Sequence, residues 1–277
     1  INPSLIEDKI THNTKAILPV HFAGRPCNMD EINNIAQKYG LKVIEDAAHA
    51  IESKYKNRKI GTIGDITCFS FYATKNITTA EGGMIITKNK DLADRIKTLS
   101  LHGLSADAWT RYSDQGYKTY LAVDIGFKYN MTDLQSSLGI HQLNRINENL
   151  KKRERIWEYF DMSFKDLPVI TPTKESPQNL HSRHLYTLLL NLEEINISRN
   201  QFLHALHSEN IGSGIHYIPI HLHPIYRDKY GYKEGNFPKA EYIGERTVSL
   251  PLSPSLTEKD VEDVVYGVKK ILNYYLK

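Results

Sequence analysis

The sequence predicts an α/β fold: a large domain with a mainly parallel sheet, followed by a smaller α+β domain. Between Ala16 and Thr87, short apolar segments alternate with helical patterns, which is typical of strands joined by crossover helices. Beyond Pro168 this alternation gives way to a shorter series of strand and helix patterns. The chain has 277 residues, of which 40% are hydrophobic and 24% charged, so it can bury a sizeable core.

Four segments rich in β-branched or aromatic residues predict the strands of the large domain, and they span 16–22, 42–48, 66–72 and 82–87. A helix is predicted between the first two strands, because apolar residues recur at helical spacing over 29–39. Asn28 can cap the start of this helix, and Gly40 stands where a left-handed C-cap belongs. A second helix is predicted over 91–101.

The middle of the chain carries an aromatic stretch and then a long helical pattern. The stretch at 105–129 contains Trp109, Tyr112, Tyr117 and Tyr120, and a connection of this length is usually functional or an interaction surface. The pattern at 132–164 predicts a helix that links two domains. Its basic residues at 151–155 are most simply a solvated face.

A domain boundary is predicted near Pro168, which gives a large domain over 1–167 and a small C-terminal domain over 168–277. The small domain is expected to contain a strand at 184–191 and a helix at 198–209. A loop at 214–224 and a final helix that begins after Thr257 follow. No internal repeat or low-complexity segment interrupts this order.

Composition excludes several classes of function. The net charge is +3 with both signs interspersed, so no nucleic-acid partner is expected. No apolar run approaches the roughly 20 residues of a membrane span. Cys27 and Cys68 fit neither a disulfide framework nor a zinc motif, which favours a reduced, cytoplasmic setting. The first residues lack an apolar core, so no signal peptide is expected, and Ile1 in place of Met indicates a processed or partial chain.

Chemically useful residues follow two of the predicted strands. In an open α/β sheet, ligands bind outside the carboxyl ends of the strands, so Asp46, His49, Ser70 and Lys75 are expected to converge there. A lysine directly after a buried strand is partly desolvated, which favours the free amine that Schiff-base chemistry requires. Asp46 would then supply a negative charge to a pyridinium nitrogen, and Ser70 a hydroxyl to a phosphate.

Taken singly, each of these residues also has a structural interpretation. Lys75 could be a surface residue, Asp46 a turn former, Ser70 a small strand residue and His49 a core histidine. The glycines of the segment 81–84 could turn the backbone near a ligand or simply mark a hairpin. Only the combination favours a ligand site.

Four segments resemble the DegT/StrS family of sugar aminotransferases: EDAAHA at 45–50, FSFYATKNITTAEGGMI at 69–85, GFKYNMTDLQSSLG at 126–139 and LPLSPSLTEKDVEDVV at 250–265. The resemblance implies a fold-type I enzyme that uses pyridoxal 5′-phosphate (PLP) to aminate nucleotide-linked keto sugars for polysaccharide or glycan synthesis. It implies that Lys75 is the Schiff-base lysine and Asp46 the partner of the pyridine nitrogen. His49 would flank the ring, and Ser70 would bind the phosphate.

Finer features of the resemblance concern the substrate. The segment HGLSADAWTRY at 102–112 resembles members that act on C4 of UDP-linked 4-keto-6-deoxy sugars, and the family implies glutamate as the amine donor. In the loop at 214–224, His216, Tyr217 and His221 are implied as substrate contacts, with loop histidines bonded to backbone as the structural alternative. No carboxylate near His221 and His223 completes a metal set, so no metal is expected.

The chain departs from the family pattern at Lys128 and Asn130, where many members carry Asn and Arg in a loop that reaches the neighbouring subunit's cofactor phosphate. The resemblance therefore implies a homodimer with shared active sites. Lysine can bind phosphate through its charge, so either residue could make the contact, and an ordinary turn is the alternative.

Family members also begin with a further N-terminal segment that helps to bind the cofactor phosphate, and this sequence starts after that segment. Its absence is expected to weaken cofactor binding. One alternative is therefore a catalytically incompetent fragment or homologue with a regulatory or structural role. A PLP-dependent sugar dehydratase is a second alternative, but dehydratases replace the lysine with His, so Lys75 argues against it.

Overall fold

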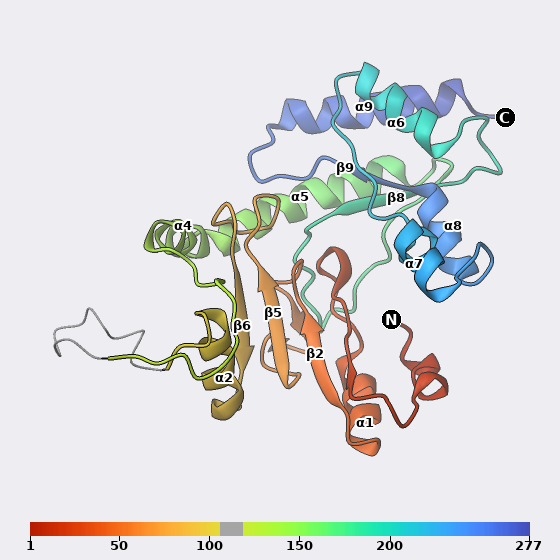
Figure 1. Ribbon diagram of the computed structural model, residues 1–277. Helices are drawn as coiled ribbons and strands as arrows, with labels where there is room; N and C mark the ends of the chain where they lie inside the picture. The colour runs from red at the N-terminus through yellow and green to blue at the C-terminus, as the bar shows by residue number, and fades with distance from the viewer. Residues whose placement is uncertain (106–118) are drawn as a thin grey trace. The chain divides into compact units, whose positions relative to one another are not determined.

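The structure is a computed structural model that describes residues 1–105 and 119–277 and divides into two compact units (Figure 1). The first unit comprises Ile1–Ile146 and Ser176–Ser182, and the second comprises Asn147–Glu175 and Arg183–Lys277. The division thus first falls after Ile146, upstream of the boundary predicted near Pro168. Most of the aromatic stretch, with Trp109, Tyr112 and Tyr117, and most of the substrate-related segment 102–112 lie outside the described residues.

The first unit is built on a four-stranded sheet of order β1-β2-β5-β6. Its strands are β1 (Ala16–Ile17), β2 (Lys42–Asp46), β5 (Ile66–Ser70) and β6 (Gly83–Thr87). The first three run parallel, and β6 is antiparallel to β5, so the prediction of a mainly parallel sheet is confirmed. Asp46 at the end of β2 is in register with Cys68 in β5. The carboxyl ends of these two strands therefore lie at the same edge of the sheet.

The first strand is shorter than the predicted range 16–22. Pro19 follows β1 and has no amide hydrogen, so it cannot donate to a neighbouring strand. Its carbonyl still accepts a hydrogen bond of 2.9 Å from the amide of Asp46, and Val20 forms an isolated parallel bridge to Asp46. The chain then turns through the short 3-10 helix η3 (Phe22–Gly24), in which Ala23 has a φ of 56°.

Helix α1 (Met29–Lys38) confirms the prediction over 29–39, and Gly40 has the expected left-handed φ of 63°. Its buried residues are Met29, Ile32 and Ala36. The predicted N-cap is wrong in one respect, because the side chain of Asn28 accepts no hydrogen bond from the start of the helix. Asn28 instead accepts a hydrogen bond of 2.7 Å from the hydroxyl of Tyr55 and donates to Glu31.

The remaining helices of the first unit are peripheral to its core. Helix α2 (Lys90–Ser100) is capped by Asn89, and α4 (Asp133–Asn144) begins with a capping box of Thr132 and Gln135. The predicted single helix over 132–164 is wrong, because the chain breaks at Arg145 before α5 (Ile146–Phe164) begins. The shorter elements are η1 (Pro3–Leu5), η2 (Glu7–Lys9) and the hairpin strands β3 (Lys54–Tyr55) and β4 (Arg58–Lys59).

The second unit has a three-stranded antiparallel sheet of order β7-β8-β9. Its elements are α5, β7 (Val169–Ile170), β8 (Tyr186–Leu190), α6 (Arg199–Ser208), η4 (Ile220–Leu222), α7 (Pro224–Tyr230), α8 (Pro238–Arg246), β9 (Thr247–Leu250) and α9 (Glu258–Tyr274). Helices α6 and α9 confirm the predicted helices, and each starts at a capping box. Residues from α5, α6, β8 and α9 form the core, with Phe160, Phe202, Leu188 and Val268 fully buried.

None of the helices in the described part of the chain has the length and apolar composition of a membrane span.

Candidate active site

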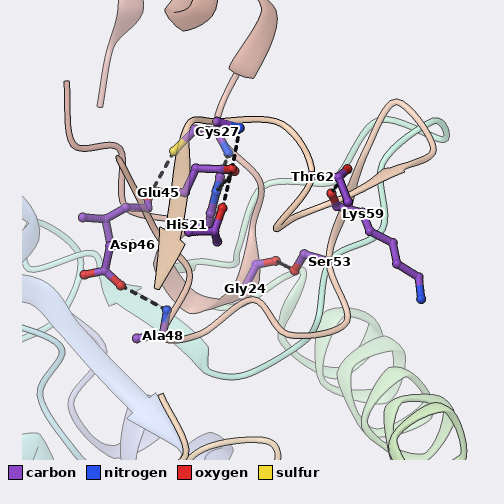
Figure 2. Close-up of polar contacts among 12 residues, drawn as sticks. His21, Gly24, Cys27, Glu45, Asp46, Ala48, Ser53, Lys59 and Thr62 are labelled. Atoms are coloured by element: carbon purple, nitrogen blue, oxygen red, sulfur yellow. Dashed lines mark hydrogen bonds and ion pairs between the residues drawn. The ribbon is translucent and has the colours of Figure 1, made fainter. Parts of the chain in front are cut away.

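Asp46 is the last residue of strand β2, and its carboxylate contacts the backbone of the loop that follows. One carboxylate oxygen, Oδ1, accepts a hydrogen bond of 3.0 Å from the amide of Ala48 (Figure 2). The main chain of Asp46 is held by the bond to Pro19 and the bridge to Val20. The carboxylate is therefore fixed at the carboxyl edge of the sheet and remains partly accessible to solvent.

Lys75 lies in the loop 71–82 between β5 and β6, in a turn closed by a hydrogen bond of 2.9 Å from its amide to the carbonyl of Tyr72. Desolvation by burial lowers the pKa of the Lys75 amine, and the negative charge of Asp46 opposes that shift. The two groups therefore interact electrostatically, as expected for residues that follow adjacent parallel strands. An amine with a lowered pKa beside a carboxylate is suited to act as a nucleophile toward a carbonyl.

Two glycines allow this loop to return close to β5. Gly83 pairs with Ser70, and a Cβ at Gly83 would lie 2.8 Å from the carbonyl oxygen of Phe69. Gly82 has a φ of 156°, and a Cβ there would lie 2.3 Å from the hydroxyl of Thr79. The glycines therefore let the end of the loop 71–82, which carries Lys75, return close to β5 at the start of β6.

Ser70 and His49 lie at the ends of the same two strands. The Ser70 hydroxyl accepts a hydrogen bond of 3.3 Å from the amide of Tyr72. His49 is buried, and its Nδ1 accepts a hydrogen bond of 3.2 Å from the amide of Ala23, which places the hydrogen of the neutral ring on Nε2. The ring centroids of His49 and Phe22 are 6.0 Å apart. Asp46 and Ser70 thus end the neighbouring parallel strands β2 and β5, and His49 and Lys75 lie in the loops that follow those strands.

Sequence reasoning missed a buried polar pair on the opposite face of β2. Glu45 and His21 are both fully buried, and His21 Nε2 donates to Glu45 Oε2 over 2.9 Å (Figure 2). His21 Nδ1 accepts from the amide of Cys27 over 3.0 Å, which fixes the tautomer. Glu45 Oε1 accepts from the amide of Gly64 over 2.7 Å and from the hydroxyl of Thr67 over 2.8 Å.

This network acts on the charge of Glu45. Burial alone would raise the pKa of Glu45, but the hydrogen bonds from His21, Gly64 and Thr67 together lower it. The carboxylate next to Asp46 in the sequence is therefore ionised and fully bonded. Its position in the apolar alternation of β2 was the available signal, because a glutamate at a buried strand position requires partners.

Lys128 and Asn130 lie together on the approach to α4. The Lys128 amine donates a hydrogen bond to the side-chain oxygen of Asn130, and Lys128 forms an isolated bridge to Leu101. The flanking rings of Phe127 and Tyr129 stack with centroids 4.9 Å apart and are largely exposed. The predicted phosphate contact by either residue stays a prediction.

The three predicted substrate contacts lie in the second unit. His216 Nδ1 is 2.7 Å from the hydroxyl of Ser249, and the ring of Tyr217 is about half exposed. His221 is buried, with Nε2 2.7 Å from Glu241 Oε1 and its ring centroid 4.8 Å from that of Phe237. His221 thus bonds to a carboxylate rather than to the backbone, and Tyr217 is the most accessible of the three. Their role as substrate contacts stays a prediction. Within the described ranges, no cluster of three or more His, Cys, Asp or Glu residues could hold a metal ion.

Comparison with known proteins identifies the family. Residues 1–269 match the DegT/DnrJ/EryC1/StrS aminotransferase family. The chain is 47% identical over 274 residues to the spore coat polysaccharide biosynthesis protein SpsC of Bacillus subtilis, a match that covers 98% of this chain and 70% of that protein.

Solved structures give the same result. Helicobacter pylori PseC, an aminotransferase involved in the biosynthesis of pseudoaminic acid, superposes with a TM-score of 0.90 at 28% identity, over 99% of this chain and 71% of that one. The PLP-form of the sugar aminotransferase Spr1654 from Streptococcus pneumoniae gives a TM-score of 0.89 at 30% identity, over 100% of this chain and 73% of that one. This chain therefore belongs to the DegT/DnrJ/EryC1/StrS family of PLP-dependent sugar aminotransferases.

Proposed function

We propose that this protein transfers the amino group of glutamate to the C4 carbonyl of a UDP-linked 4-keto-6-deoxy sugar. The observation that carries the proposal is Lys75, an amine whose pKa is lowered by burial and which interacts with the carboxylate of Asp46 where β2 and β5 end. Family membership supports a sugar substrate. The choice of UDP and of C4 rests on the resemblance of the segment 102–112.

The residues of the candidate site fit PLP by their chemistry. The Lys75 amine would bind the cofactor covalently, and the Asp46 carboxylate would keep the ring nitrogen protonated. The Ser70 hydroxyl and the loop with Lys128 and Asn130 offer a hydrogen-bond donor and a positive charge for the phosphate. When bound, PLP supplies an electron sink that stabilises negative charge on the carbon that bears the amino group.

Lys75 is also the group that would move protons. In the first half-reaction its free amine would take a proton from Cα of glutamate. The amino group would stay behind on the bound cofactor, and water would supply the carbonyl oxygen of the 2-oxoglutarate that leaves. In the second half-reaction it would give a proton to C4 of the sugar. That carbon would receive the amino group held from the first half-reaction and lose its carbonyl oxygen as water, and the amino sugar would leave. Burial increases the fraction of Lys75 that is a free base near neutral pH, while Asp46 limits that shift.

We further propose a homodimer in which Lys128 and Asn130 serve the neighbouring subunit's site. The exposed, stacked rings of Phe127 and Tyr129 beside them, and the exposed Leu134 of α4, support a protein interface on this part of the first unit. A cytoplasmic location is part of the same proposal, since both cysteines are free thiols.

An assay of substrate range tests this function. Purified holoenzyme is mixed with glutamate and with UDP-linked and dTDP-linked 4-keto-6-deoxy sugars, and products are identified by mass spectrometry. We expect a UDP-linked 4-amino sugar and 2-oxoglutarate, and neither product from a Lys75→Ala variant. A product that has lost a hydroxyl without gaining an amine would favour the dehydratase alternative. No amination of any 4-keto sugar nucleotide by a PLP-loaded protein would contradict the assigned substrate class.

A further inference from the structure

Asn76, the neighbour of Lys75 in the chain, is tied by its side chain to two distant segments. Its Nδ2 donates one hydrogen bond of 2.9 Å to Glu52 Oε2 and another of 3.0 Å to the carbonyl of Ser182. Both hydrogens of the amide are therefore used. Glu52 and Ser182 are both buried, so these bonds are shielded from water.

Ser182 joins three loops through three separate groups. Its amide donates to the carbonyl of Gly24 over 3.1 Å, its hydroxyl donates to the carbonyl of His49, and its own carbonyl accepts from Asn76. These partners lie in the loops that follow β1, β2 and β5. Ser182 is fully buried, so a single side chain and its backbone hold together the loops of the candidate site.

Gly24 shows how tightly these loops pack. It has a φ of 96°, and a Cβ at this position would lie 2.0 Å from the Ser182 hydroxyl. Its carbonyl also accepts a hydrogen bond of 2.7 Å from the Ser53 hydroxyl (Figure 2). No side chain larger than hydrogen fits here without displacing Ser182.

The segment Ser176–Ser182 is itself held by the β3–β4 hairpin. Leu180 exchanges backbone hydrogen bonds of 3.0 and 2.9 Å with Lys54. The amide of Asn57 donates to the carbonyl of Gln178 over 3.0 Å, and the side chain of Asn179 accepts from the amide of Lys56 over 2.8 Å. The segment is thus a fixed support for the loops that Ser182 contacts.

We propose that Asn76 and Ser182 are positioning residues that hold the Lys75 loop and His49 against the segment Ser176–Ser182. The proposal rests on the proposed role of Lys75. Freed from these bonds, the Lys75 loop would sample more conformations, and the amine would be more hydrated. Greater hydration removes the largest cause of the lowered pKa, so Lys75 would present less free amine near neutral pH.

Hydrogen exchange and cofactor capture test the proposal. The variants are Asn76→Asp, which keeps the size of the side chain but removes its donors, together with Asn76→Ala and Ser182→Ala. Tyr55→Phe is the control, because it removes a partly buried side-chain hydrogen bond of 2.7 Å to Asn28 and leaves the backbone bonds between Lys54 and Leu180 in place. Amide exchange over residues 73–79 is measured in the apoprotein. The rate of PLP capture by Lys75 is then measured from pH 6 to 10 by borohydride trapping and peptide mapping.

We expect faster exchange over residues 73–79 in both Asn76 variants. In Asn76→Ala, which adds no charge beside Lys75, capture at pH 7 should slow roughly tenfold and its pH profile should move to higher pH. Ser182→Ala should speed exchange around His49 and slow capture to a smaller extent. Tyr55→Phe should match the wild type in both measurements.

The proposal would be overturned if Asn76→Ala and Ser182→Ala showed the same exchange and the same capture as the wild-type protein. It would also be overturned if Tyr55→Phe had as large an effect. Should Asn76→Ala fail to fold, the other two variants decide the result. If the wild-type protein captures no PLP on Lys75, the proposed function fails. The exchange data of the apoprotein still test whether Asn76 and Ser182 hold the loop.

Discussion

Replacing Glu45 by glutamine tests how the buried pair beneath the site stabilises the first unit. Glutamine keeps the volume and, through Oε1, can still accept from Gly64 and Thr67. Its amide nitrogen, however, would face the Nε2 hydrogen of His21, which now donates to Glu45 over 2.9 Å. The ring cannot move its hydrogen to Nδ1, because Nδ1 accepts from the amide of Cys27 over 3.0 Å. One buried donor must therefore lose its partner.

The expected cost follows from the kind of bond that is lost. A hydrogen bond to a charged group contributes about 1.5–3 kcal/mol, and a buried donor without a partner costs a similar amount, while removal of a buried charge offsets part of the loss. We expect Glu45→Gln to destabilise the first unit by about 2–3 kcal/mol at pH 7. Thr67→Val, which removes one donor to the same carboxylate, should cost about 1–2 kcal/mol.

The effect should depend on pH in a defined direction. The pKa of Glu45 in the folded protein lies below its ordinary value of 4.5, so the unfolded chain binds more protons than the folded one in this range. The stability that Glu45 provides is therefore fully present above pH 4.5 and is lost as the pH falls through the lowered value. The difference between wild type and Glu45→Gln should shrink accordingly.

Amide hydrogen exchange of β2 measures this difference within the first unit alone. A loss of 2–3 kcal/mol corresponds to exchange that is roughly 30 to 150 times faster. Glu7→Gln is the control, because Glu7 forms an exposed pair with Lys38 and its substitution should leave β2 exchange unchanged. Equal exchange in Glu45→Gln and wild type at pH 7 would refute the reasoning, as would a difference that grows as the pH falls below 4.5.

Three further predictions follow from the site and the core. Asp46→Asn should retain PLP, which is detected by its absorbance. Its transamination rate should fall more than a hundredfold, which corresponds to about 3 kcal/mol in the barrier, because an amide cannot hold the ring nitrogen protonated. Near-normal turnover would show that the required carboxylate lies elsewhere. Mixing inactive Lys75→Ala protomers with inactive Lys128→Ala, Asn130→Ala protomers should restore activity in heterodimers, and subunits that demonstrably exchange without activity would contradict shared sites. Phe202→Ala should destabilise the second unit by about 3–5 kcal/mol, since Phe202 is fully buried. Denaturant unfolding followed by Trp157 fluorescence measures this loss, and a loss below about 1 kcal/mol would contradict the packing of that core.

Local sequence signals predicted most elements of the fold. Apolar spacing located α1, and the Ser198 and Thr257 capping boxes mark the starts of α6 and α9. The break at Arg145 was missed because no Gly or Pro marks it. The spacing of apolar residues in α4 also continues into α5 without interruption. The two helices nevertheless differ in burial, because Leu134 of α4 is 82% exposed and belongs to no core of the described chain. Periodicity cannot distinguish a face that packs on the core from one that does not.

The site was predictable where it depends on strand ends and missed where it depends on distant contacts. Asp46 ends β2 and Lys75 follows the adjacent parallel strand β5, so topology alone brings them near each other. The hydrogen bond from Asn76 to Ser182 joins residues 106 positions apart, and no local sequence pattern predicts it. Glu45 was missed because a charged residue beside Asp46 resembles part of a solvent-exposed motif until its buried partners are seen.

The central claim is that the Lys75 amine is the group that binds PLP covalently. The direct measurement is borohydride reduction of the PLP-loaded protein, followed by proteolysis and mass spectrometry of every lysine-containing peptide. The account predicts a single reduced pyridoxyl adduct, on the peptide that contains Lys75, and none in a Lys75→Ala variant. A stoichiometric adduct on any other lysine, or its persistence in the Lys75→Ala variant, would contradict the account.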